Sequence, residues 1–107
     1  MKPKDPIKAS YEGNMHSEIT DAVSSGNYEL VKRLLETGHD VNWADGFGIT
    51  NLMVSAYKGD REITRLLLEY GANINMKDMN GKTAIDWATD YKHEFLIDII
   101  KSTKKKY

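Results

Sequence analysis

The feature that most restricts the fold of this 107-residue chain is an internal repeat with a period of 33 residues. Residues 38–42 read GHDVN, and residues 71–75 read GANIN. The same shift superposes further glycines, turn residues and apolar residues: Gly26 on Gly59, Asp45 on Asp78, Gly48 on Gly81, Thr50 on Thr83, and Leu34 on Leu67. A fixed period of about 33 residues is typical of stacked supersecondary units, each of which buries its apolar face against its neighbours.

Each unit is predicted to contain two short helices. In the middle unit, Leu52 and Ala56 are four residues apart, as are Ile63 and Leu67, and this spacing places each pair on one face of a helix. Gly59 separates the two helices, because glycine readily adopts the left-handed conformation that ends a helix. The stretch rich in Asp, Gly and Asn that follows each helix pair predicts a hairpin-like turn.

These motifs resemble the ankyrin repeat family, whose units run D-x-x-G-x-T-P-L-H-x-A, then a glycine, a run of leucines and G-A-D-V-N. The middle unit here reads DGFGITNLMVSA followed by KGDREITRLLLEYGANIN, and the third unit reads DMNGKTAIDWATDY. The resemblance covers about residues 16–101. It implies an all-α ankyrin repeat solenoid of three stacked helix–turn–helix units with short hairpin-like turns between them.

The terminal units resemble the capping repeats of that family. The first has no hairpin and begins directly with the predicted helix SEITDAVS, and the third contains GKTAIDWA. We therefore expect a complete small protein and, since a capped stack has no open sheet edge, a monomer. The expected organisation is a flexible leader at 1–14, one domain at 15–101 with repeats at about 15–42, 43–75 and 76–101, and a lysine-rich tail at 102–107.

Two departures from the family pattern affect the start of the first helix in a unit. The T-P-L-H tetrapeptide appears as TNLM at 50–53 and TAID at 83–86, without the proline or the histidine. Because proline pre-sets the first helical turn, its loss is expected to reduce local rigidity. Thr50 remains a predicted N-cap. Asp86 can still accept the hydrogen bond made by the family's histidine, whereas Met53 is expected to lack it.

Composition excludes several other classes of protein. The net charge is −1, so the chain has no global preference for nucleic acid or an anionic membrane. It contains no cysteine, and its apolar runs are far too short to span a bilayer, so we expect a cytoplasmic protein. His16, His39 and His93 lie in different units without metal-ligand spacing. We expect no enzyme activity, no cofactor and no small-molecule substrate.

The family resemblance implies a concave binding surface made by the hairpin tips and by the first helix of each pair. Carried over position by position, the expected contact residues are Trp43, Phe47, Ile49, Tyr57, Lys58, Lys77, Met79, Lys82, Trp87, Asp90 and Tyr91. Several are large and apolar, and aromatic residues and Met are enriched at protein interfaces. For Trp43 and Trp87, packing inside a small core remains the alternative.

The sequence therefore predicts a protein–protein interaction module. The neighbouring acidic residues Asp45, Asp78 and Asp90 favour a partner of mixed or basic charge. One alternative is a regulatory or scaffold subunit of a separate enzyme. Another is association of the lysines at 101–106 with nucleic acid or an anionic surface, although such a short run more often keeps a chain end soluble.

Overall fold

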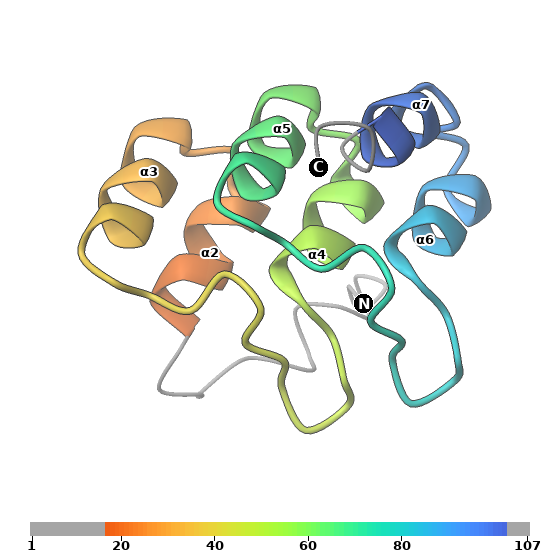
Figure 1. Cartoon of the computed structure of the whole chain (residues 1–107), viewed down its shortest axis with the longest axis horizontal. Coiled ribbons are helices and arrows are strands. Elements are labelled where there is room, and N and C mark those ends of the chain that lie inside the picture. Colours follow the sequence, from red (N-terminus) through yellow and green to blue (C-terminus); the bar gives the residue numbers. More distant parts are fainter. Residues whose placement is uncertain (1–16, 103–107) are drawn as a thin grey trace, which may run out of the picture.

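A computed structural model describes residues 17–102, and this part of the chain folds into six helices (Figure 1). They are α2 (Ser17–Ser24), α3 (Tyr28–Glu36), α4 (Asn51–Lys58), α5 (Arg61–Glu69), α6 (Ala84–Asp90) and α7 (Phe95–Ser102). Helices α2, α4 and α6 form one row, and α3, α5 and α7 form a second row packed against it, which is the upper row in Figure 1. The predicted stack of three helix pairs is confirmed. The leader expected at 1–14 and the lysines at 104–106 lie outside the described residues.

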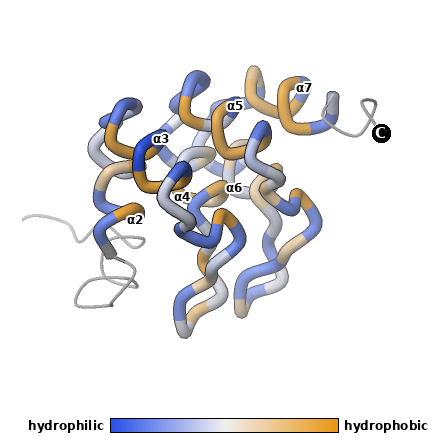
Figure 2. The backbone as a smooth tube through the Cα atoms, turned by 60° about the vertical axis from the view of Figure 1, so that its left-hand side comes forward, coloured by the Kyte–Doolittle hydropathy of each residue, from blue (hydrophilic) through white to orange (hydrophobic). Residues whose placement is uncertain are grey.

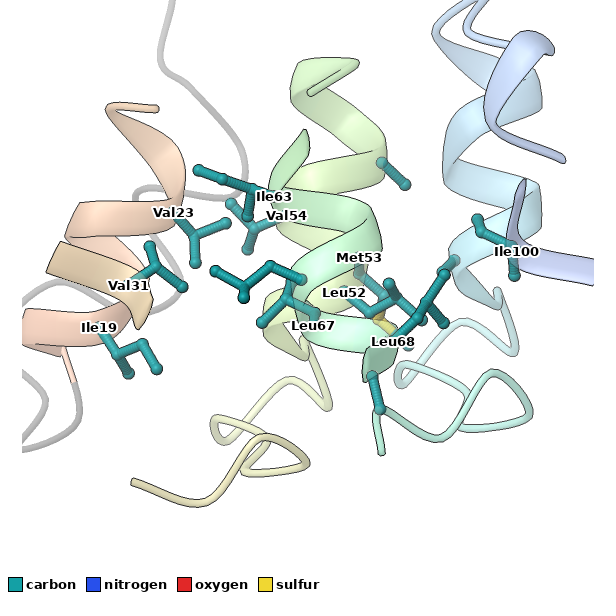
Figure 3. Close-up of a cluster of buried hydrophobic side chains, with 14 of the residues drawn as sticks. Ile19, Val23, Val31, Leu52, Met53, Val54, Ile63, Leu67, Leu68 and Ile100 are labelled. Atoms are coloured by element: carbon teal, nitrogen blue, oxygen red, sulfur yellow. The ribbon is translucent and has the colours of Figure 1, made fainter. Parts of the chain in front are cut away.

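The two rows enclose one continuous apolar core. Helices α3 and α5 carry hydrophobic residues on one face and hydrophilic residues on the other (Figure 2), whereas Asn51 to Ala56 of α4, in the middle of the stack, are all buried. Val23 of α2, Val54 of α4 and Ile63 of α5 are fully buried and point toward one another (Figure 3). The same cluster extends from Ile19 in the first helix pair to Ile100 in the last. Each fully buried aliphatic side chain contributes about 1.5–3 kcal/mol, so the helix pairs stabilise one another by burying these side chains between them.

The residues predicted to cap the helices do so. The hydroxyl of Thr50 accepts a hydrogen bond from the backbone N–H of Met53 at 3.2 Å, and Gly59 ends α4 in the left-handed conformation with φ of 73°. Thr83 caps α6 in the same way, and the Asp86 carboxylate accepts the Thr83 N–H at 3.0 Å, as expected. The Met53 sulfur lies 3.5 Å from the Thr50 nitrogen, so a weak acceptor does occupy the histidine position.

The predicted hairpin-like turns project from the open side of the α2–α4–α6 row (Figure 1). In the middle repeat, the Asp45 N–H donates to the Ile49 carbonyl at 3.1 Å, and the Gly48 N–H donates back to the Asp45 carbonyl at 2.9 Å. In the third repeat, the Asp78 N–H donates to the Lys82 carbonyl at 2.9 Å. The repeated sequence thus builds the same small hairpin twice.

The two hairpins are joined to each other. The Met79 N–H donates to the Phe47 carbonyl at 2.9 Å, which links one tip directly to the next. A Cβ atom placed on Gly48 would lie 2.9 Å from the Asp78 Cα, closer than two such atoms approach in proteins. Glycine at 48 is therefore required both for its φ of 78° and for the close approach of the neighbouring hairpin.

A second link between repeats comes from the recurring asparagine of the G-x-x-x-N phrase. The side-chain amide of Asn42 donates to the Gly71 carbonyl at 3.2 Å, and its oxygen accepts the Asn73 N–H at 2.7 Å. One side chain thereby satisfies two backbone groups of the next repeat. This contact ties the first phrase, GHDVN, to the second, GANIN.

Candidate functional site

Three aromatic side chains gather on the hairpin-bearing row of helices. Tyr57 of α4 packs edge-on against Trp87 of α6, with ring centroids 5.9 Å apart, and against Tyr91, with centroids 4.5 Å apart. Trp87 and Tyr91 are one helical turn apart and stack at 5.6 Å with an angle of 11° between the rings. Tyr57 and Trp87 are half-buried, and Tyr91 is 40% exposed. We call these three residues the aromatic cluster.

A hydrogen bond fixes the orientation of Trp87. Its indole Nε1 donates to Oδ2 of Asp78 at 3.0 Å. The other oxygen of Asp78 accepts the N–H groups of Asn80 and Lys82 at 2.9 and 3.0 Å. One carboxylate therefore holds the third hairpin and the indole together. Trp87 also packs against the buried core, as the alternative interpretation of the sequence expected, while its role as a contact residue stays a prediction.

Charged groups border the aromatic cluster. The ammonium of Lys82 lies 5.8 Å from the Trp87 ring centroid and forms an ion pair with Asp90. The hydrogen bond to Asp90 raises the pKa of Lys82 above its ordinary value, so Lys82 is charged at neutral pH. The Lys58 ammonium lies 5.8 Å from the Tyr57 ring centroid. These positions allow the lysine charges to interact with the electron-rich ring faces.

Apolar side chains project from both hairpin tips. Phe47 is 50% exposed and Met79 is 68% exposed, and the backbone hydrogen bond between these residues keeps the tips adjacent. Lys77 is also exposed, in the segment that leads into the third hairpin. Of the residues that the sequence singled out, the structure brings together Tyr57, Trp87, Tyr91 and Lys82 in one group. It brings together Phe47 and Met79 in a second group at the hairpin tips.

The prediction that Ile49 contacts a partner is wrong. Only 8% of Ile49 is exposed, because it follows the tip and its side chain joins the buried core. Its N–H donates to Oδ1 of Asp45 at 3.0 Å, which anchors this turn of the chain. Asp45 and Asp78 were expected to be surface charges flanking the site. Each is only 7% exposed, because its carboxylate accepts backbone N–H groups inside its own hairpin.

Trp43 lies half-buried where the chain enters the middle hairpin, and its N–H donates to the Asp40 carbonyl at 3.2 Å. Within residues 17–102, the ring pairs of the aromatic cluster do not extend to it. His39 is half-buried, with Nδ1 3.0 Å from the Leu34 carbonyl oxygen.

The described part of the chain contains no group of three or more His, Asp or Glu side chains arranged to hold a metal ion. None of its helices has the length and apolar character that crossing a bilayer requires.

The aligned helix pairs and their projecting hairpins define a helical repeat solenoid. The family model described as ankyrin repeats, in three copies, matches residues 19–106. The chain therefore belongs to the ankyrin repeat family, whose repeats generally form protein-interaction modules. No curated protein sequence matches the chain significantly.

Sequence reasoning missed the hydrogen bond between Trp87 and Asp78. A signal for it was present, because the acidic residue recurs with the 33-residue period, as a structural turn residue does. The residue one period before Trp87 is Val54, so an indole N–H appears only in the third repeat. The third hairpin therefore has a side-chain contact to α6, from Asp78 to Trp87, that the middle hairpin lacks to α4.

Proposed function

We propose that the protein is a non-enzymatic binding module that holds a partner protein on its hairpin side. The proposed surface consists of the exposed tip residues Phe47 and Met79 and of the aromatic cluster of Tyr57, Trp87 and Tyr91. The observation that carries the proposal is the aromatic cluster itself, in which rings from two successive repeats pack together while part of Tyr91 remains exposed.

The composition of this surface supports binding to protein. Tyr, Trp, Phe and Met are enriched at protein interfaces, and a few such residues commonly contribute most of the binding energy. The rings are already ordered by mutual contact and by the hydrogen bond of Trp87, so little side-chain entropy is lost when a partner covers them. A preformed apolar surface of this kind favours a folded or extended polypeptide over a small polar ligand.

A regulatory or scaffold role in an enzyme complex would use the same surface. The two roles differ only in the identity of the partner, so one capture experiment addresses both. The full chain is immobilised and incubated with native lysate, and the bound proteins are identified by mass spectrometry. Baits carrying Phe47→Ala and Tyr57→Ala are expected to lose the partner, because truncating a residue at the centre of an interface commonly weakens binding by 2 kcal/mol or more, roughly 30-fold.

Phe95→Ala is the matched control, because Phe95 is an equally exposed aromatic residue, at 44%, on α7 in the second row of helices. This variant is expected to capture the partner as the wild type does. Far-UV circular dichroism verifies that all three variants keep their helices. If the Phe47 and Tyr57 variants retain the partner and the Phe95 variant loses it, the binding surface lies on the other row and the proposal is wrong.

A further inference from the structure

We infer that the partner presents a carboxylate group beside an apolar side chain to the third-repeat end of the proposed surface, so that an acidic polypeptide segment is bound there. This inference rests on the proposed function and specifies the chemistry of the partner. It reverses the preference for a basic partner that the acidic residues of the sequence suggested, because most of those residues present no accessible oxygen at the surface.

The carboxylates near the site are largely used within the protein. Asp45 and Asp78 are buried, and each accepts two backbone N–H groups through Oδ1. The Asp86 carboxylate accepts both the N–H and the hydroxyl of Thr83 at the start of α6. A basic side chain of a partner therefore cannot form a close contact with Asp45 or Asp78.

The lysines, in contrast, are accessible. Lys82 sits on the third hairpin with its ammonium near the Trp87 ring and is half-exposed. An ammonium group has three N–H donors, and Asp90 accepts from one of them, which leaves donors for a further acceptor. Lys77 is exposed on the same hairpin, next to Asp78, and forms no ion pair with the described residues.

The aromatic rings and Lys82 form one contact area, since the Lys82 ammonium lies 5.8 Å from the Trp87 ring centroid. A partner residue that covers the exposed edge of Tyr91 and the Trp87 ring brings its chain neighbours within reach of Lys82. A carboxylate at such a neighbouring position gains a charge-assisted hydrogen bond in a region from which the apolar contact has removed water, where such bonds are stronger. A lysine or arginine at that position meets the ammonium of Lys82, which already holds Asp90, and is repelled.

The test is a selection from a phage-displayed library of random 16-residue peptides on the immobilised full chain. Wild-type bait is expected to enrich peptides with Asp or Glu within two residues of Leu, Ile, Phe or Trp. The double charge reversal Lys77→Glu with Lys82→Glu is expected to shift the enrichment to Lys and Arg at those positions. The control reversal Lys32→Glu with Lys101→Glu changes two exposed lysines on α3 and α7, in the other row of helices, and is expected to select the same peptides as wild type.

A synthetic copy of the most enriched peptide is then titrated by fluorescence anisotropy. Binding is expected to weaken at least tenfold with the Lys77/Lys82 reversal and to stay within twofold with the Lys32/Lys101 reversal. Enrichment of basic peptides by wild type, or equal peptide binding by both reversals, overturns the acidic-partner inference while leaving the surface in place. If no peptide is enriched, or if the enriched peptide binds Tyr57→Ala as it binds wild type, the proposed surface itself is wrong and the inference falls with it.

Discussion

The indole N–H of Trp87 donates to Oδ2 of Asp78, whereas the equivalent oxygen of Asp45, one repeat earlier, is buried without a hydrogen-bond partner in the described structure. Val54 occupies the position that corresponds to Trp87 and cannot donate a hydrogen bond. The two hairpins therefore differ by one side-chain contact while sharing the same backbone hydrogen bonds. Because the chain carries both versions, each repeat serves as the control for the other.

The first prediction concerns these two aspartates. Asp78→Asn replaces one carboxylate oxygen by an NH₂ group, so either the indole or the hairpin N–H groups lose their acceptor. We expect the free energy of unfolding to fall by about 1–3 kcal/mol. Asp45→Asn can keep its accepting oxygen toward the hairpin and loses no side-chain partner, so its effect is expected to be smaller. Urea unfolding followed by circular dichroism measures both, and an equal loss in the two variants contradicts the role given to Trp87.

The second prediction tests the close approach of the hairpins. Gly48 and Gly81 have nearly the same φ, 78° and 79°, so alanine at either position bears the left-handed strain of roughly 1–2 kcal/mol. Only at Gly48 would the added methyl group strike the backbone of Asp78, since nothing lies within 4 Å of the same atom at Gly81. We expect Gly48→Ala to be the more destabilising by about 1–3 kcal/mol. Thermal unfolding of the two variants measures this difference. Similar unfolding midpoints would mean that the two hairpins can move apart without a loss of stability, and would contradict the prediction.

The third prediction concerns the asparagine that joins the repeats. Asn42→Ala removes two hydrogen bonds to the next repeat and is expected to destabilise the stack by about 1–2 kcal/mol. Asn75 holds the same position one repeat later but is exposed, and its side chain makes no such bond to residues 17–102. Asn75→Ala is therefore expected to be nearly neutral. Chemical denaturation distinguishes the two, and a larger effect at position 75 would contradict this account.

The fourth prediction separates core from surface within one hairpin. Ile49→Ala is expected to destabilise the protein by about 2–5 kcal/mol, since it leaves a cavity in the buried cluster. Phe47→Ala, two residues earlier, removes a larger side chain that is half in solvent, and its effect is expected within about 0.5 kcal/mol. Equilibrium unfolding of both variants is the measurement. If Phe47→Ala were the more destabilising of the two variants, Ile49 would again be a candidate contact residue.

The sequence was sufficient for the fold because its strongest signals are periodic. Gly59 and Thr50 end and begin helices through local backbone conformation and local hydrogen bonds, so their roles follow from sequence position alone. The core positions follow in the same way, since helical spacing places Leu52 and Ile63 on the buried face of each helix.

The site was predicted less completely because hairpin side chains have no such period. Phe47 and Ile49 both precede the helix and are both apolar, yet one is exposed and the other is buried beneath the turn. Their environments depend on the packing of the neighbouring hairpin, which one sequence does not specify. Asp45 and Asp78 were misjudged for a related reason, because a formal charge count does not distinguish a solvated carboxylate from one that accepts backbone N–H groups.

The hydrogen bond between Met79 and Phe47 has a consequence for how a ligand is received. Because the two hairpins are hydrogen-bonded to each other, they cannot tilt independently, and they contact an incoming polypeptide as one rigid surface. Such preorganisation reduces the ordering entropy lost on association and favours tight recognition of one shape over loose adaptation to many.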